Sequence, residues 1–312
     1  MNNNKSGFWK GKKVLVTGAG GFIGYNLCLK LKEMNAEVTA FSRTVRDELK
    51  ENGIEQHKGE ITDQELIQKL VDKVDIIFHL AANPSIWKSM NDPMMDCKTN
   101  IIGTLTVLNA AKNDQKKVIF PSTIALYRNA DTEQECDEDT KICPDNFYSL
   151  SKYTCEQYCL LFYKLFRIPI SIARLSYVYG PNLKRGVIYD IVKQIVQEKK
   201  KKIELFMLPE NKLNFIHIDD AIDALLIIAS NQNAVGEIFN IGSDKDNNIN
   251  EIIQFVGKQC GCKIEVALHE HADKTKINFN VNYEKAKKVL DWKPIYNLKQ
   301  GLLKIIDNIK VS

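Results

Sequence analysis

A glycine-rich turn between an apolar run and a helical pattern constrains this chain more than any other feature of its sequence. Residues 14–17 read Val-Leu-Val-Thr, which predicts a buried strand, and Gly18, Gly21 and Gly24 follow it. Glycines at this spacing permit a tight turn, let the backbone approach a pyrophosphate, and bring the next helix onto the sheet. Free N–H groups at the start of that helix, expected over residues 25–34, can bind the anion. The turn therefore predicts a dinucleotide-binding unit.

Apolar strands alternate with helical patterns along the first half of the chain. This alternation is typical of right-handed βαβ units with a parallel sheet. We therefore predict an α/β fold of the Rossmann type, with a doubly wound parallel sheet and a smaller C-terminal α/β substrate lobe. After the first unit, strands or helices are expected over residues 37–41, 64–71, 74–82, 96–112 and 117–120.

The length of 312 residues allows one large domain or two unequal lobes. We expect a dinucleotide-binding domain over residues 8–175, to which residues 213–241 return. Residues 176–212 and 242–312 are expected to form the substrate-binding lobe.

Charge and hydropathy exclude several classes of protein. The formal net charge of +4, from 43 basic and 39 acidic residues, is too small an excess to indicate nucleic-acid binding. No apolar run approaches the roughly 20 residues needed to span a bilayer. The first residues lack the apolar segment of a signal peptide. We expect a cytoplasmic protein that binds neither nucleic acid nor a membrane.

The cysteine pattern does not predict a metal site. Eight cysteines in an intracellular chain of this size suggest free thiols. Cys260 and Cys262 precede His269 and His271, but the single residue between the cysteines departs from the usual spacing of structural zinc sites. We predict no bound metal.

The second strand ends at Ser42 and Arg43, where dinucleotide folds place the residue that contacts the adenosine ribose. A carboxylate there binds the 2′-hydroxyl of NAD, yet the first carboxylate after this strand is Asp47. Because a guanidinium pairs with phosphate, the sequence favours NADP, with NAD as the alternative. Glu60 and Ile61 follow a short third strand and are expected at the cofactor, where Glu60 can reach the adenine amine.

The strand predicted over residues 74–82 ends in small residues. Leu80, Ala81 and Ala82 are expected to leave room for the cofactor at the strand end. His79 lies within the apolar run and is predicted to be a hydrogen-bonded core histidine. Asn100 interrupts an apolar helix face and is predicted to be a buried hydrogen-bonding brace.

A tyrosine and a lysine mark a candidate proton-transfer site. Tyr148 and Lys152 are four residues apart in a predicted helix and therefore lie on one face. The ammonium, together with a positively charged nicotinamide, is expected to lower the phenol pKa from its usual value of about 10. Ser122 and Thr123 end a parallel strand, at the edge where such sheets bind ligands.

Seven motifs carry a family resemblance, at residues 17–24, 78–82, 100–104, 148–152, 174–181, 215–220 and 240–242. Together they resemble the extended short-chain dehydrogenase/reductase superfamily. Within it, the chain is most similar to the NAD(P)-dependent epimerase/dehydratase family, which acts on nucleotide sugars. The resemblance extends from Lys13 to about Leu303.

The resemblance implies a role for each residue of the site. Tyr148 is implied to be the general base and acid on the sugar hydroxyl, Lys152 to orient the nicotinamide ribose, and Thr123 to hydrogen-bond the reacting oxygen. Removal of the proton of the C4 hydroxyl, with transfer of hydride from C4 to the nicotinamide, gives a 4-keto sugar. A homodimer through the helices that contain Asn100 and Tyr148 is also implied. The implied lining of the cofactor cleft includes Phe22, Ile23, Ala81 and Asn100.

Two residues after Thr123 separate the branches of the family. Dehydratases carry an Asp-Glu pair there and decarboxylases need the glutamate, but this chain has Ile124 and Ala125, which cannot transfer a proton. A 4-epimerase is therefore predicted. An NADPH-dependent 4-keto-sugar reductase is the alternative, and a non-catalytic NAD(P)-binding sensor is the alternative of another class.

The chain departs from the family where the substrate diphosphate binds. Many members carry asparagine at the position of Tyr177 and arginine at the position of Leu213. Arg185, Lys274 or Lys276 could replace the missing charge. The expected substrate contacts are Ser122, Thr123, Tyr177 and Arg185.

Overall fold

Seven parallel strands form the main sheet of the protein, whose computed structural model describes residues 4–127 and 135–311. The strand order is β10-β6-β5-β4-β1-β2-β3, so the chain reverses its direction of travel across the sheet beside β1. Such a switch point opens a crevice at the carboxyl ends of the strands. The predicted Rossmann-type fold is confirmed. The strands are β1 (Lys13–Thr17), β2 (Glu37–Ser42), β3 (Glu55–Lys58), β4 (Ile76–His79), β5 (Lys117–Thr123), β6 (Ile170–Leu175) and β10 (Ile238–Ile241).

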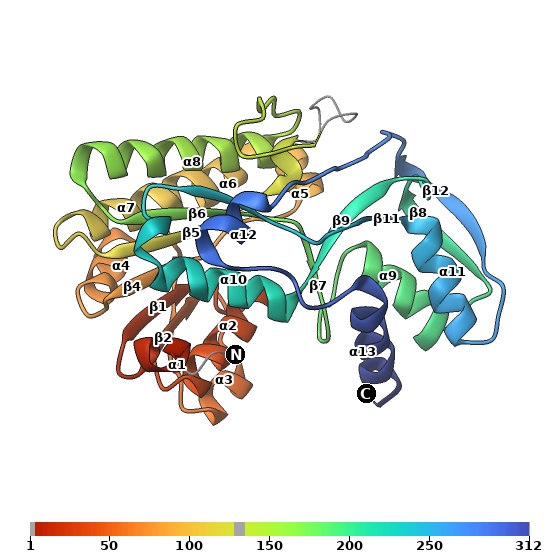
Figure 1. The fold of residues 1–312 in the computed structure, drawn as a ribbon, viewed down its shortest axis with the longest axis horizontal. Helices are drawn as coiled ribbons and strands as arrows, with labels where there is room; N and C mark the ends of the chain where they lie inside the picture. The colour runs from red at the N-terminus through yellow and green to blue at the C-terminus, as the bar shows by residue number, and fades with distance from the viewer. Residues whose placement is uncertain (1–3, 128–134, 312) are drawn as a thin grey trace.

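Helices cover both faces of this sheet (Figure 1). The longer ones are α2 (Phe22–Glu33), α4 (Gln64–Val71), α7 (Gly103–Lys112), α8 (Phe147–Phe166) and α10 (Ile218–Ser230). Val14 and Val16 of β1 pack in one apolar cluster with Leu27 of α2 and Leu225 of α10. Leu15 points to the other face and packs in a second cluster with side chains of α4, α7 and α8. Both faces of the sheet are therefore buried, as a parallel sheet requires.

Short helices connect these elements near the crevice. They are α3 (Asp47–Glu51), α5 (Ile86–Asn91), α6 (Pro93–Cys97) and a 3₁₀ turn (Ile124–Tyr127). Helix α1 (Asn4–Trp9) leads into the amino end of β1, away from the crevice. A π-helical turn (Lys98–Ile102) joins α6 directly to α7. The helix predicted over residues 96–112 therefore begins earlier, because Asp92 caps it and Pro93 suits its first position. π-helical turns occur frequently at functional sites.

The end of β4 also differs from the prediction. The sequence predicts a strand over residues 74–82, whereas β4 ends at His79. Beyond it, the chain turns past the end of β1, and the Leu80 N–H donates to the Thr17 carbonyl at 3.2 Å.

Two small sheets build the second lobe, which lies at the right of Figure 1. One has the order β11-β9-β7 and the other pairs β12 with β8 in parallel. A third apolar cluster, which includes Leu213, Phe215 and Phe279, fills this lobe. Strand β9 thus pairs in the second lobe, while α10 and β10 return to the main sheet. The elements of this lobe are β7 (Tyr177–Tyr179), α9 (Val187–Val192), a π-helical turn (Lys193–Gln197), β8 (Lys202–Met207), β9 (Lys212–His217), β11 (Asp246–Asn248), α11 (Ile249–Gln259), β12 (Glu265–Asp273) and α13 (Leu298–Val311). The 3₁₀ turn (Gln232–Ala234) and α12 (Glu284–Leu290) belong to the main lobe, where Ala234, Ala286 and Leu290 pack in the first apolar cluster.

The described residues contain no helix with the length and apolar character needed to cross a membrane. Within the same part of the chain, no group of three or more His, Cys, Asp or Glu side chains is arranged to hold a metal ion. The thiols of Cys260 and Cys262 are not disulfide-bonded.

Candidate active site

The glycine turn follows β1 and leads directly into α2, which begins at Phe22, earlier than predicted. Gly18 has φ of +70°, and a Cβ atom there would lie 2.7 Å from the carbonyl oxygen of Leu80. A Cβ atom on Gly24 would lie 2.4 Å from the Gly18 carbonyl oxygen. Only glycine therefore permits these close approaches. The resulting cradle, with the N-terminus of α2 at its base, fits the pyrophosphate of a dinucleotide.

The loop after β2 closes over this turn. Ser42 donates a hydrogen bond through its hydroxyl to the Thr44 carbonyl, and Arg43 is exposed. Sequence reasoning missed Arg46, whose Nε donates to the Gly20 carbonyl at 3.0 Å. The Arg46 guanidinium also lies 4.5 Å from the centroid of the Tyr25 ring. The missed signal was a second basic residue in the same short loop.

Residues expected at the adenine end lie at the end of β3. Glu60 is exposed, whereas Ile61 is buried. A Cβ atom on Gly103 would lie 2.6 Å from the Ile61 side chain, so Ile61 packs directly on α7. The carboxylate of Glu60 is therefore open to a ligand, and Ile61 supports the wall beside it.

His79 is a structural histidine, as predicted. Its Nδ1 lies 2.9 Å from Thr17 Oγ1, and its Nε2 lies 3.1 Å from Thr104 Oγ1. Burial lowers the pKa of His79 to about 3, and the ammonium of Lys152 acts in the same direction. The Ala81 N–H donates to Thr17 Oγ1 at 3.1 Å, which fixes the chain just beyond β4.

Asn100 lies in the π-helical turn and is the predicted buried brace. Its Oδ1 accepts from the Asn83 N–H at 2.7 Å. Its Nδ2 lies 3.0 Å from Asp96 Oδ1 and 2.9 Å from Ser151 Oγ. The carboxamide is therefore occupied by protein partners and connects the chain after β4 to helix α8.

Tyr148 lies in the first turn of α8, opposite the end of β5. Asn146 caps the helix, and Ser89 Oγ accepts from the Tyr148 N–H at 3.1 Å. The Thr123 side chain and the charge of Arg185 lie close enough to the phenol to act on its pKa. The structure thus brings three of the predicted site residues together, although they lie far apart in sequence.

The protein's own groups raise the pKa of Tyr148, so its lowering by Lys152 together with a bound nicotinamide stays a prediction. Burial raises the pKa of this phenol to about 12, although the Thr123 side chain and Arg185 oppose the rise. The ammonium of Lys152 does not lower the pKa, because it donates to the Pro121 carbonyl at 2.7 Å and lies 3.9 Å from the Phe120 ring centroid. Burial lowers the pKa of Lys152 as well. The two side chains share a helix face, but in this conformation the ammonium is directed toward the end of β5.

Ser122 lies between Pro121 and Thr123 at the end of β5. Its hydroxyl is buried and has no hydrogen-bond partner among the described residues. A buried hydroxyl without a partner is uncommon and favours a polar ligand at this position.

A buried ion pair behind the site was not predicted. Arg174 Nη2 lies 2.8 Å from Glu156 Oε2, and both side chains are almost fully buried. Arg174 Nη1 donates to the Tyr127 hydroxyl at 2.6 Å, which in turn donates to Asn240 Oδ1 at 2.9 Å. Since Glu156 lies one helical turn after Lys152, this network fixes α8 against β6 and β10.

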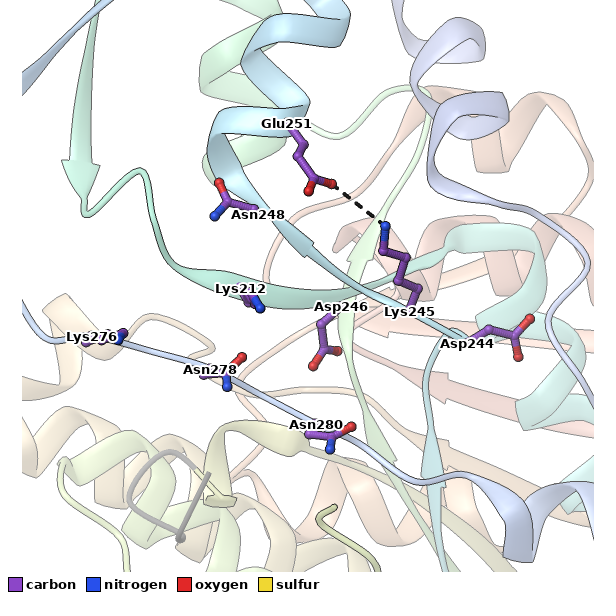
Figure 2. Close-up of a pocket in the computed structure, with 9 residues that line it drawn as sticks. All are labelled: Lys212, Asp244, Lys245, Asp246, Asn248, Glu251, Lys276, Asn278 and Asn280. Atoms are coloured by element: carbon purple, nitrogen blue, oxygen red, sulfur yellow. Dashed lines mark ion pairs between the residues drawn. The ribbon is translucent and has the colours of Figure 1, made fainter. Parts of the chain in front are cut away.

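A polar pocket of about 790 Å³ lies in the second lobe (Figure 2). Asp246 projects toward Asn278 and Asn280 in this view, and it accepts from Asn214 Nδ2 at 2.8 Å. Of the lysines expected to replace the missing charge, Lys276 lines the pocket and Lys274 does not. The full lining is Lys212, Asp244, Lys245, Asp246, Asn248, Glu251, Lys276, Asn278 and Asn280.

The two positions that depart from the family pattern form part of an apolar wall. Leu213 is fully buried in the cluster of the second lobe. The Tyr177 ring lies 5.9 Å from that of Phe215 and 6.1 Å from that of Phe279, measured between centroids. Neither position therefore presents a cation to a ligand.

Comparison with known proteins identifies relatives along nearly the whole chain. A family model described as the NAD dependent epimerase/dehydratase family matches residues 14–242. A dTDP-D-glucose 4,6-dehydratase of Dictyostelium discoideum is 31% identical over 268 residues, covering 78% of this chain and 61% of that protein. A UDP-glucuronate 4-epimerase of Thermodesulfobacterium geofontis is 29% identical over 313 residues, covering 94% of each protein.

Solved structures support the same grouping. The structure of UDP-glucuronic acid 4-epimerase from Bacillus cereus, in complex with UDP-glucuronic acid and NAD, is 27% identical to this chain with a TM-score of 0.86. The match covers 96% of this chain and 99% of that one. The similarity therefore includes both lobes.

Proposed function

The chain belongs to the NAD dependent epimerase/dehydratase family, and on that basis we propose that it is a nucleotide-sugar 4-epimerase. The observation that carries the proposal is that the Thr123 side chain lies close enough to the Tyr148 phenol, at the end of β5, to oppose the rise of its pKa. It gives one site both a proton acceptor and a donor to the reacting oxygen. Lys152 on the same helix supplies a nearby positive charge.

In the proposed mechanism, Tyr148 removes the proton of the C4 hydroxyl and later returns it. Thr123 donates a hydrogen bond to the C4 oxygen and holds it at the phenol. The glycine turn and the residues around it would hold a nicotinamide cofactor, which would supply hydride-transfer chemistry at C4 of the sugar. Lys152 would orient the nicotinamide ribose. The residues proposed to hold the cofactor are Gly18, Gly21, Phe22, Ile23, Gly24, Ser42, Arg43, Glu60, Ile61, Leu80, Ala81, Ala82, Asn100, Tyr148 and Lys152.

The residues after Thr123 favour epimerisation over loss of water or carbon dioxide. Ile124 and Ala125 are buried in the 3₁₀ turn that follows β5. Elimination of water needs a further acid and base at the sugar, and neither side chain can move a proton. One relative is a dehydratase, and the preference for epimerisation therefore rests on Ile124 and Ala125 rather than on overall similarity.

The loop after β2 favours a second candidate function, an NADPH-dependent 4-keto-sugar reductase. Arg43 and Arg46 bring two guanidinium groups to this loop, and no carboxylate lies between the end of β2 and Asp47. Guanidinium groups suit a 2′-phosphate. We propose that the site accepts NADP as well as NAD, the cofactor named for the family and for the Bacillus cereus structure.

The proposed substrate contacts are Ser122, Thr123, Tyr177 and Arg185. Because Leu213 and Tyr177 form an apolar wall, the anionic part of the substrate needs a cation from elsewhere. Arg185 is proposed to supply it, since its charge acts on the Tyr148 phenol and its side chain is exposed.

Incubation of the purified protein with UDP-glucose or UDP-glucuronate, without added reductant, tests the function. The C4 epimer is expected by NMR, with no net change in reduced cofactor. Stoichiometric NADPH consumption with a 4-keto sugar would instead indicate a reductase, and a 4-keto-6-deoxy product would contradict the proposal. Chromatography of the dinucleotide released on denaturation identifies the cofactor.

The proposal includes a homodimer through α7 and α8. Leu150 and Leu161 of α8 are 48% exposed, at positions that share one helix face, and Ile102 beside α7 is 44% exposed. Light scattering is expected to give twice the chain mass, and Leu161→Glu to give the monomer mass. Leu268→Glu places the same change at a similarly exposed site of β12 and should leave the dimer intact. A monomeric wild-type protein would refute the dimer.

A further inference from the structure

A buried carboxylate lies beside the catalytic pair without a part in the proposed mechanism. Asp96 is in α6, immediately before the π-helical turn, and its side chain is only 1% exposed. Its Oδ1 accepts from Asn83 Nδ2 at 3.2 Å and from Asn100 Nδ2 at 3.0 Å. Burial raises the pKa of Asp96 above its usual value, although hydrogen bonding and the charge of Lys152 oppose the rise.

The same hydrogen bonds extend to the helix that carries the catalytic residues. Ser151 immediately precedes Lys152 in sequence and lies in the turn after Tyr148. Ser151 Oγ accepts from Asn100 Nδ2 at 2.9 Å and lies 3.0 Å from the Tyr148 carbonyl oxygen. Asp96 is therefore connected through Asn100 to Ser151 of α8 by two hydrogen bonds.

The charge of Asp96 also faces both catalytic groups. Tyr177, Asp96 and Arg185 are the charged or titratable groups that act on the Tyr148 phenol, together with the Thr123 side chain. Those that act on the Lys152 ammonium are Cys155, Cys159, Glu156 and Asp96. The carboxylate of Glu156 is paired with Arg174. Asp96 has no arginine or lysine salt-bridge partner among the described residues, so its negative charge is not neutralised in this way.

We propose that Asp96 is a positioning residue for the catalytic pair. Its buried carboxylate holds Asn83 and Asn100, and Asn100 in turn holds Ser151 in the first turns of α8. Its negative charge acts on Tyr148 and Lys152. This inference rests on the proposed function, but neither the glycine turn nor the Tyr148–Lys152 spacing predicts it.

Asp96→Asn tests the charge through the pH profile of kcat/KM. A nearby anion raises the pKa of both a phenol and an ammonium, so its removal lowers both. The pKa values of Tyr148 and Lys152 should therefore both fall by about one unit, and both limbs of the profile should move to lower pH. We also expect kcat to fall about tenfold because the helix turn is less firmly held, with KM for the sugar nucleotide changed less than twofold.

Asp92→Asn is the matched control. Asp92 caps the same helix, is exposed, and accepts from the Met95 N–H at 2.9 Å, a bond that asparagine can also accept. It should leave both limbs and kcat at their wild-type values. A folded Asp96→Asn protein with wild-type limbs would overturn the proposal.

Ser151→Ala provides a second test that does not alter the Asp96 charge. It removes the hydroxyl that links Asn100 to α8 while the carboxylate stays in place. A fall in kcat of about tenfold without movement of either limb is expected. A wild-type kcat in this variant would overturn the positioning role, including where Asp96→Asn yields no folded protein.

A spectroscopic titration separates this inference from the proposed function. The absorbance of the Tyr148 phenolate, obtained as wild type minus Tyr148→Phe at saturating NAD⁺, gives the phenol pKa without turnover. Asp96→Asn should lower this midpoint by about one unit. If the wild type does not epimerise any nucleotide sugar but the midpoint moves, only the proposed function fails. Equal midpoints would overturn the role of Asp96.

Discussion

Tyr148→Phe should lower kcat for C4 epimerisation about a thousandfold, because the variant retains the ring but has no group that accepts the proton of the C4 hydroxyl. Loss of a transition-state interaction leaves KM nearly unchanged. The fold should be retained, since the Tyr148 N–H still donates to Ser89 and Asn146 still caps α8. Initial rates with UDP-glucose, measured by NMR, check the result.

Tyr153→Phe is the control for this prediction. Tyr153 lies in the same helix and is half-buried, but it is not among the groups that act on the Tyr148 phenol. Its kcat should stay within twofold of wild type. A Tyr148→Phe variant with more than a tenth of wild-type kcat would exclude the phenol as the proton acceptor. A cofactor-binding sensor would bind its ligand equally well in both variants and catalyse nothing.

Glu156→Ala should lower the free energy of unfolding by about 3–5 kcal/mol, because it leaves the Arg174 guanidinium buried without its counter-charge. The side chains of Glu156 and Arg174 are 0% and 3% exposed, so water cannot replace the lost carboxylate. The remaining partner of the guanidinium among side chains is the Tyr127 hydroxyl, at 2.6 Å. Urea unfolding followed by circular dichroism measures the change.

Glu33→Ala provides the comparison for an exposed ion pair. Glu33 Oε2 lies 3.0 Å from Lys30 Nζ in α2, and the Glu33 side chain is 66% exposed. Such pairs contribute about 1 kcal/mol or less. Equal losses of stability in the two variants would show that the buried pair does not anchor α8.

The sequence predicted the main sheet because its signals are local. Apolar runs such as residues 14–17 and the glycines that follow them impose strand and turn without help from distant residues. The meeting of Thr123 and Tyr148 was also predictable, because a strand that ends at the ligand-binding edge places its last residues there. The roles assigned to the individual site residues remain predictions.

The missed features depend on tertiary packing. The π-helical turn at Lys98–Ile102 adds one residue to a helix without a change in composition, so periodicity does not reveal it. The direction of the Lys152 side chain depends on the Pro121 carbonyl, which lies on another element. Arg46 and Asp96 acquire their partners only when the loops fold over the turn and the helices pack.

The hydrogen bond from Lys152 to Pro121 has a consequence for the sequence of events in a catalytic cycle. The ammonium already has one strong acceptor, so a ribose hydroxyl can replace that acceptor with little net change in free energy. Under the proposed function, a dinucleotide that binds first would draw the Lys152 charge toward the phenol, and a sugar that arrived earlier would meet a phenol without that help. We therefore expect ordered kinetics in which the dinucleotide binds before the sugar.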